Sequence, residues 1–112
     1  MNNYDFDQER KQLMDLMKNT DDIFNDFGRI DDIVFSEGVI PRKYKELTMV
    51  AVSIASKCEE CIEYHIKECL KMNSSAPEII DAIKMGMMAS GSLSYPYLRH
   101  SFKILKKLKI IN

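Results

Sequence analysis

The sequence predicts an all-α protein, a compact bundle of five to seven helices around a buried central helix. Apolar residues recur at helical spacing along most of the 112 residues, which is the pattern of amphipathic helices. No segment shows strict apolar–polar alternation or the Asn-Gly or Asp-Gly pair of a tight hairpin, so no strand is indicated. The segment from Leu47 to Ala55 has no charged residue, and a helix that is apolar on most sides is buried on most sides.

Length and composition favour one soluble domain over residues 1–112. The hydrophobic fraction of 46% and the charged fraction of 29% are ordinary for a globular protein. No apolar run approaches the roughly 20 residues of a membrane span, and the acidic N-terminus lacks the basic and apolar regions of a signal peptide. We therefore expect a cytoplasmic protein that does not act at a membrane. Three cysteines do not suggest a secreted disulfide framework.

Charge is distributed unevenly along the chain. Residues 1–40 carry ten acids and four bases, whereas Arg99 to Asn112 contain five bases and no acid. Solvated helix surfaces explain this pattern, and so does a docking surface for an identical subunit or a redox partner. Basic residues with interleaved aromatics do not stand out, so nucleic-acid binding is not expected.

The first 40 residues are expected to form a helical extension. Apolar residues among charges predict a first helix over residues 4–18. Thr20 or Asp21 can cap a second helix that ends near Gly28, and a short helix or turn then reaches Gly38.

The central helix is expected to begin at Pro41, because proline suits a first helical turn. Ser56 and Lys57 end it, and the next helix begins near Cys58. Asn73 can adopt the left-handed conformation that ends the helix beginning near Cys58.

Two more helices complete the predicted bundle. Ser75 can cap the first of them, and its small residues from Gly86 to Gly91 allow another helix to approach closely or mark its end. The pattern breaks at Pro96, and a last helix runs to about Leu108.

Residues 58–65 read C-E-E-C-I-E-Y-H and carry the chemistry that the sequence suggests. On a helix, Cys58, Cys61 and His65 have the spacing i, i+3 and i+7, which places them along one face. Thiols one turn apart can reach the Cα separation of a disulfide, roughly 4.4–6.8 Å. A histidine one turn further can take up or release a proton. This pattern predicts thiol redox chemistry.

Two other interpretations of these residues remain open. The cysteines could be core residues beside an incidental His65. A zinc site would need four ligands, and Cys69 is about 16 Å along the helix from Cys58, too far to share one ion. The missing ligands would have to come from His100, an acid or another chain. We expect Cys69 to pack in the core, and we expect no metal and no cofactor.

In the redox interpretation, a thiolate attacks peroxide and a second thiol then forms a disulfide. Because His65 is one turn from Cys61, we expect Cys61 to attack and Cys58 to resolve, although the reverse order stays open. Glu46 precedes the apolar run and is either a surface carboxylate or a buried group that relays protons.

At these residues the chain resembles the carboxymuconolactone decarboxylase superfamily, in particular its alkylhydroperoxidase D-like branch. The resemblance runs from about residue 41 to 105. It includes a glutamate twelve residues before the first cysteine, the C-x-x-C-x-x-x-H motif, and the small residues before Pro96. We could match no motif in residues 1–40.

The resemblance implies an all-α subunit that assembles into trimers or hexamers and reduces hydroperoxides. Glu46, Cys58, Cys61 and His65 match the family's site residues, and the second cysteine is the one that attacks peroxide. The expected partners are a hydroperoxide substrate and an external dithiol donor of the lipoyl or thioredoxin type. Glu60 occupies the position of another family histidine, so a relay through that histidine cannot operate unchanged. The alternatives are a decarboxylase-like enzyme using Glu46 and His65, and a metal-binding or assembly module.

Overall fold

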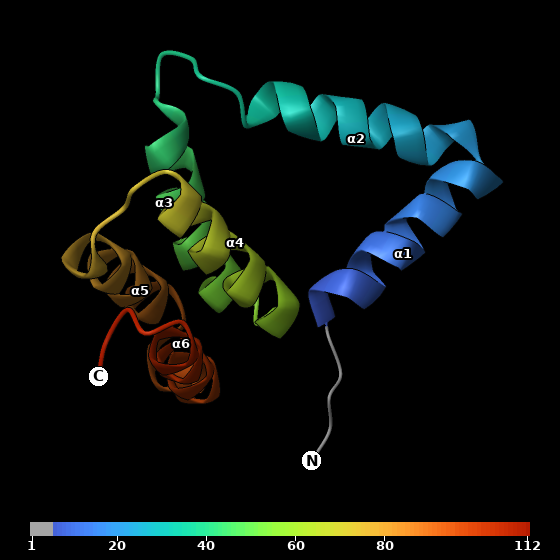
Figure 1. Ribbon diagram of the computed structural model, residues 1–112. Helices are drawn as coiled ribbons and strands as arrows, with labels where there is room; N and C mark the ends of the chain where they lie inside the picture. Colours follow the sequence, from blue (N-terminus) through green and yellow to red (C-terminus); the bar gives the residue numbers. More distant parts are fainter. Residues whose placement is uncertain (1–5) are drawn as a thin grey trace. The chain divides into compact units, whose positions relative to one another are not determined.

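The computed structural model describes residues 6–112 and confirms the all-α fold (Figure 1). Within these residues the chain forms six α-helices and one 3-10 helix, with no β-strand. The predicted first helix began at residue 4, and its first two residues lie outside the described range. The elements are α1 (Phe6–Thr20), α2 (Asp22–Val34), α3 (Arg42–Ala55), α4 (Glu59–Lys71), α5 (Ala76–Ser90), η1 (Gly91–Ser94) and α6 (Tyr95–Lys107).

The chain divides into two compact units, Met1–Ser36 and Glu37–Asn112. The division falls close to residue 40, where the sequence predicted the end of a helical extension. The prediction that all residues form one domain stays a prediction. None of the described helices is long and apolar enough to cross a membrane.

The first unit contains α1 and α2, with one residue between them. That residue, Asp21, caps α2 by accepting a hydrogen bond from the Ile23 N–H at 3.0 Å, as one of the two predicted caps. No residue of α2 is buried, and Phe27 is 71% exposed. This pair of helices therefore presents its apolar side chains at the surface.

The predicted end of the second helix near Gly28 is wrong, because α2 continues through Gly28 to Val34. A glycine inside a helix costs only about 1 kcal/mol relative to alanine. Apolar residues at helical spacing continue beyond it, so no separate short helix forms there. The apolar pattern outweighed the local preference of glycine.

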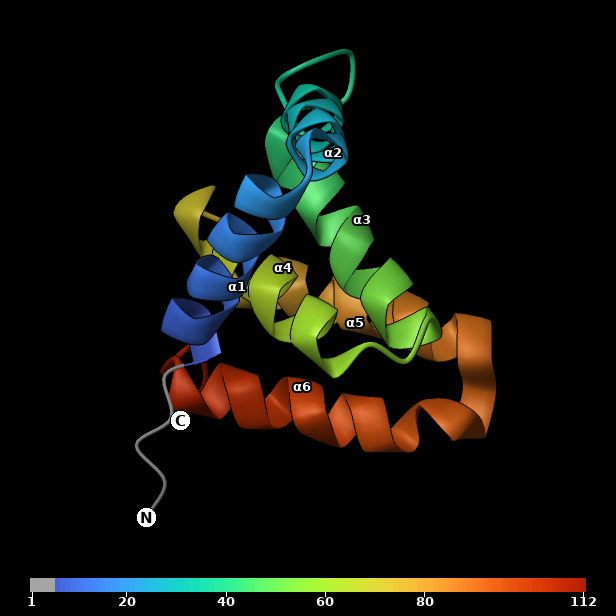
Figure 2. The ribbon, with the colours of Figure 1, turned by 90° about the vertical axis from the view of Figure 1, so that its right-hand side faces the viewer.

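In the second unit, α3 is the central helix and packs against both α4 and α5. The N-terminal cap of α3 is Pro41, one residue earlier than the predicted first-turn position. In Figure 2, α6 runs beneath α4 and α5, and it contacts both. The buried apolar core consists of Val50, Ile54, Ile62, Ile66, Cys69, Ile79, Ile83, Ile104 and Leu105.

Local signals in the second half of the chain are confirmed. Asn73 has a positive φ of 60° after α4. Ser75 and Glu78 form a reciprocal capping box at the start of α5, in which each side chain accepts from the other residue's N–H. Gly91 has a φ of 60° and ends α5. These residues set where α4 ends and where α5 begins and ends.

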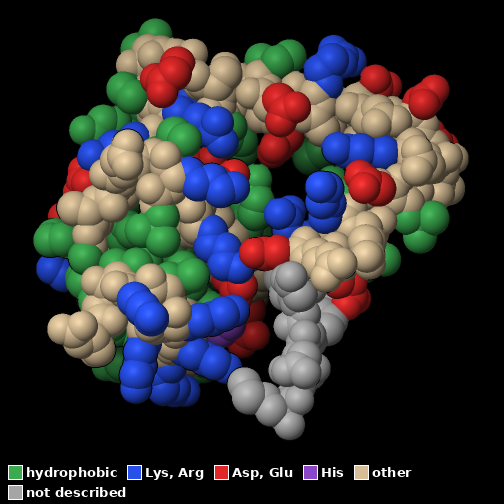
Figure 3. All heavy atoms as spheres, viewed as in Figure 1, with side chains coloured by type: hydrophobic (Ala, Val, Ile, Leu, Met, Phe, Trp, Pro, Cys, Tyr) green, Lys and Arg blue, Asp and Glu red, His purple; other side chains and the backbone are tan. Residues whose placement is uncertain are grey.

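The basic end of the chain lies on α6, where lysine and arginine side chains gather at the surface (Figure 3). One of them, Lys107, reaches Glu63 on α4 at 3.5 Å, and Lys67 reaches the same carboxylate at 2.8 Å. Burial acts to raise the pKa of Glu63, but the two lysines outweigh it and the pKa is lowered. Part of this positive charge therefore ties α6 to α4.

Gly86 allows α5 to approach α3 closely. A Cβ atom at this position would lie 2.7 Å from Ile54 Cβ and 2.9 Å from the Ala51 carbonyl oxygen. Both atoms belong to the rigid central helix, so neither can move away easily.

We expect Gly86→Ala to lower the free energy of unfolding by about 1–3 kcal/mol, the usual cost of overpacking. Gly28→Ala is the matched control, because the nearest atom to its added Cβ is the end of the flexible Lys18 side chain at 3.5 Å. That control should be neutral or stabilising, since alanine favours helix. Urea denaturation of both variants measures the difference, and equal effects would contradict the close contact.

Candidate active site

The two cysteines of the motif form a disulfide at the start of α4. Their Cα atoms are 5.3 Å apart, within the predicted range. The Cys61 N–H also donates to Cys58 Sγ at 3.3 Å. Cys58 is the N-cap residue, with extended backbone, and α4 begins one residue later, near the predicted position. The sulfur of Cys58 thus occupies the place where a side-chain oxygen usually caps a helix.

A short link between α3 and α4 sets the position of Cys58. Ser56 ends α3, and Lys57 adopts a left-handed conformation with a φ of 58°. The Cys58 N–H then donates to the Ser53 carbonyl at 3.0 Å. These contacts turn the chain back, so that α4 packs against α3. Both cysteines remain partly exposed, which leaves the disulfide open to small molecules.

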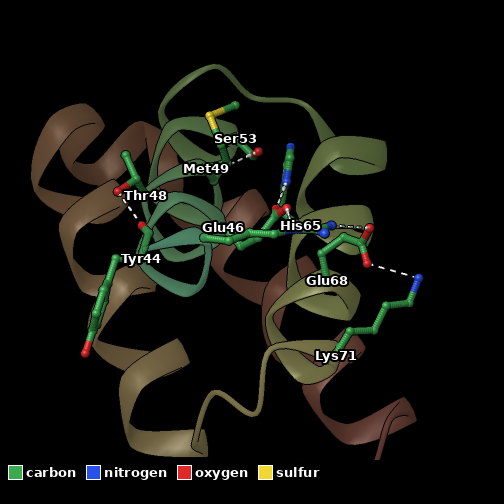
Figure 4. A network of polar contacts seen from close by, with 9 residues as sticks. Tyr44, Glu46, Thr48, Met49, Ser53, His65, Glu68 and Lys71 are labelled. Atoms are coloured by element: carbon green, nitrogen blue, oxygen red, sulfur yellow. Dashed lines mark hydrogen bonds and ion pairs between the residues drawn. The ribbon is translucent and has the colours of Figure 1, made fainter. Parts of the chain in front are cut away.

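Glu46 and His65 meet between α3 and α4 (Figure 4). Glu46 Oε1 lies 2.7 Å from His65 Nδ1, and the two residues are only 2% and 8% exposed. Of the two interpretations of Glu46, a surface carboxylate is therefore wrong and a buried carboxylate is correct. Because Nδ1 faces the carboxylate, this contact fixes the orientation of the imidazole ring.

His65 and Cys61 share one face of α4. They are four residues apart on a regular helix, which places their Cβ atoms roughly 5–6 Å apart. The structure thus brings together the four residues that the sequence selected. A disulfide lies one helical turn from a buried carboxylate–imidazole pair.

Three further charged residues extend the pair and were missed by sequence reasoning. Arg42 lies between Glu46 and Glu68, and Lys71 contacts Glu68 on its other side. A signal for Glu68 existed, because it is three residues after His65 on the same helical face. Arg42 precedes Glu46 by four residues, the spacing of an ion pair on a helix.

Cys69 is separate from this chemistry. It is fully buried in the core, as predicted. Burial, with a smaller contribution from the negative charge of Glu46, raises the pKa of its thiol to about 12. A thiol with this pKa is almost entirely protonated at neutral pH and reacts slowly.

No group of three His, Cys, Asp or Glu side chains suited to hold a metal ion occurs among residues 6–112. The metal-binding alternative therefore gains no support from the arrangement of the described side chains.

The sequence model of the carboxymuconolactone decarboxylase family matches residues 21–106. Among curated proteins, "uncharacterized protein 4 in cox locus" of Paracoccus denitrificans is 24% identical over 82 residues, 73% of this chain and 74% of that protein. The family match begins before the region in which sequence reasoning found a resemblance, so it includes part of the N-terminal extension.

Solved structures show the same fold. A carboxymuconolactone decarboxylase family protein of Thermotoga maritima, suggested to be involved in an antioxidative response, superposes with a TM-score of 0.86 at 28% identity over 93% of this chain and 89% of that one. A family member from Legionella pneumophila gives 0.80 at 21% identity over 90% of each chain. The chain belongs to the carboxymuconolactone decarboxylase family.

Proposed function

We propose that the protein is a thiol-dependent antioxidant enzyme that reduces hydroperoxides, or disulfides, through a Cys58/Cys61 dithiol–disulfide cycle. The observation that carries this proposal is the Cys58–Cys61 disulfide one helical turn from the buried Glu46–His65 pair. The antioxidative response suggested for the Thermotoga relative supports the same class of chemistry.

The cycle balances with a hydroperoxide and a dithiol as the two substrates. The Cys61 thiolate attacks the terminal peroxide oxygen, so an S–O bond forms, the O–O bond breaks and an alcohol leaves with a proton. The Cys58 thiol then attacks the sulfenic acid, which forms the disulfide and releases water. An external dithiol, of the lipoyl or thioredoxin type, returns two electrons and two protons and becomes a disulfide.

The Glu46–His65 pair is suited to the proton transfers in this cycle. An ionised Glu46 accepts a hydrogen bond from Nδ1–H and fixes the ring, so that the imidazole is held in place to exchange a proton with a thiol. The protonated ring can then donate this proton to the alkoxide leaving group. This arrangement needs no histidine at the position of Glu60.

Two features bear on which sulfur attacks. His65 lies one turn from Cys61, which favours Cys61. The Cys61 N–H points at Cys58 Sγ, and such a donor stabilises a thiolate on Cys58 once the pair is reduced. We propose Cys61 as the attacking residue, because proton transfer must accompany bond breaking and His65 is the base beside it.

A decarboxylase-like reaction is the second candidate, and the buried carboxylate–imidazole pair is the observation that favours it. Such a reaction would use Glu46 and His65 as acid and base and would not need the thiols. Activity that survives alkylation of both motif cysteines would therefore support this candidate and contradict the thiol cycle.

We expect an alkyl hydroperoxide to oxidise two of the three thiols of each reduced subunit. Cys69 should remain a free thiol, because its burial and its pKa of about 12 keep it protonated. Thiol titration of the unfolded protein before and after peroxide treatment, with peptide mapping, measures this. A thiol count that peroxide leaves unchanged would reject the proposed function.

Single cysteine variants assign the roles. Cys61→Ser should abolish peroxide consumption, whereas Cys58→Ser should still react once and accumulate a Cys61 sulfenic acid detectable by dimedone labelling. Cys69→Ser is the matched control and should turn over at the wild-type rate. A sulfenic acid on Cys58 in the Cys61→Ser variant would reverse the assignment.

A further inference from the structure

A row of alternating charges extends from the Glu46–His65 pair toward the surface (Figure 4). Arg42 Nε lies 3.8 Å from Glu46 Oε2, and Arg42 Nη2 lies 3.7 Å from Glu68 Oε1. Lys71 Nζ lies 3.0 Å from Glu68 Oε2. Both carboxylates are at least 90% buried, the Arg42 side chain is 36% exposed and the Lys71 side chain is 69% exposed.

The formal charges of this row cancel when His65 is neutral. Arg42 and Lys71 are positive, and Glu46 and Glu68 are negative. A buried carboxylate without a compensating cation would draw a proton onto the imidazole beside it and hold it there. Arg42 and His65 both lie beside the Glu46 carboxylate. The positive charge of Arg42 therefore balances Glu46 even when the ring is neutral.

We propose that Arg42, Glu68 and Lys71 are positioning residues that set the pH at which His65 takes up a proton. The positive charge of Arg42 acts directly on Glu46. The negative charge of Glu68 opposes that of Arg42, and the positive charge of Lys71, at the surface, opposes that of Glu68. The consequence for peroxide reduction rests on the proposed function, but the effect on His65 protonation does not.

Other titratable groups also lie near the pair. The Tyr64 ring stands edge-on to His65 with ring centres 5.0 Å apart, and the raised pKa of Cys69 keeps that thiol neutral. On α5, Glu78 is already paired with Lys43 at 2.9 Å.

The proposal is tested by the NMR titration of the His65 ring in the oxidised protein, where neither motif thiol can ionise. Arg42→Gln should raise the titration midpoint by about one pH unit, the lower end of the shift caused by a neighbouring charge. Glu68→Gln should lower it, and the double variant should return near the wild-type value.

Three further variants serve as controls. Arg42→Lys keeps the charge and should titrate near the wild type. Lys71→Gln alters a side chain that is 69% exposed, and should raise the midpoint by less than Arg42→Gln. Lys43→Gln removes the same charge from the same helix, but away from Glu46, and should leave the midpoint unchanged.

Opposite shifts for Arg42→Gln and Glu68→Gln are the signature of charge balance, since loss of packing alone would not change sign. Equal midpoints in wild type, Glu68→Gln and Lys71→Gln would overturn the proposal, even if Arg42→Gln failed to fold. The pH profile of peroxide reduction separates the two claims. If the midpoint of the His65 titration shifts and the pH profile of peroxide reduction does not, the charge-balance proposal holds and the proposed catalytic role of His65 is contradicted.

Discussion

The hydrogen bond between Glu46 and His65 is the contact on which the site depends. It joins α3 to α4, and both side chains are buried. A buried carboxylate is costly without a partner, so the imidazole both stabilises Glu46 and is oriented by it. The contact therefore links α3 to α4 and orients the ring of His65, to which we assign proton transfer beside Cys61 in the proposed function.

Local backbone contacts at the start of α4 position the disulfide. Lys57 turns the chain, the Cys58 N–H is held by Ser53, and the Cys58 sulfur sits where the first N–H groups of α4 point. The bond to Cys61 thus lies at one helix end, and neither of its cysteines belongs to the buried apolar core. The redox cycle that we propose would act at this helix end, outside the core.

Local parts of this description could be predicted from sequence, and contacts between helices could not. The spacing of Cys58, Cys61 and His65 lies within two turns of one helix, so periodicity was sufficient. Glu46 is 19 residues from His65 on another helix. The sequence singled out this glutamate but left open whether it is a surface or a buried carboxylate, and only the family resemblance placed it in one site with the cysteines. The charges beyond it were missed because ion pairs such as that of Arg42 with Glu68 depend on how α3 crosses α4. The predicted helix end near Gly28 was wrong because the low helix preference of glycine was weighed above the apolar pattern around it. The predicted trimer or hexamer, the cytoplasmic location and the electron donor stay predictions.

The most direct test of the account is the rate at which hydroperoxide oxidises the reduced Glu46→Gln variant, measured by stopped flow against the wild type. Glutamine has nearly the same shape, so folding and thiol number serve as checks that only the charge has changed. The account predicts a rate lower by roughly 100-fold, the scale of general acid–base catalysis by a positioned side chain. An unchanged rate in a folded variant would contradict it, because the buried carboxylate would then have no part in the chemistry of the thiols.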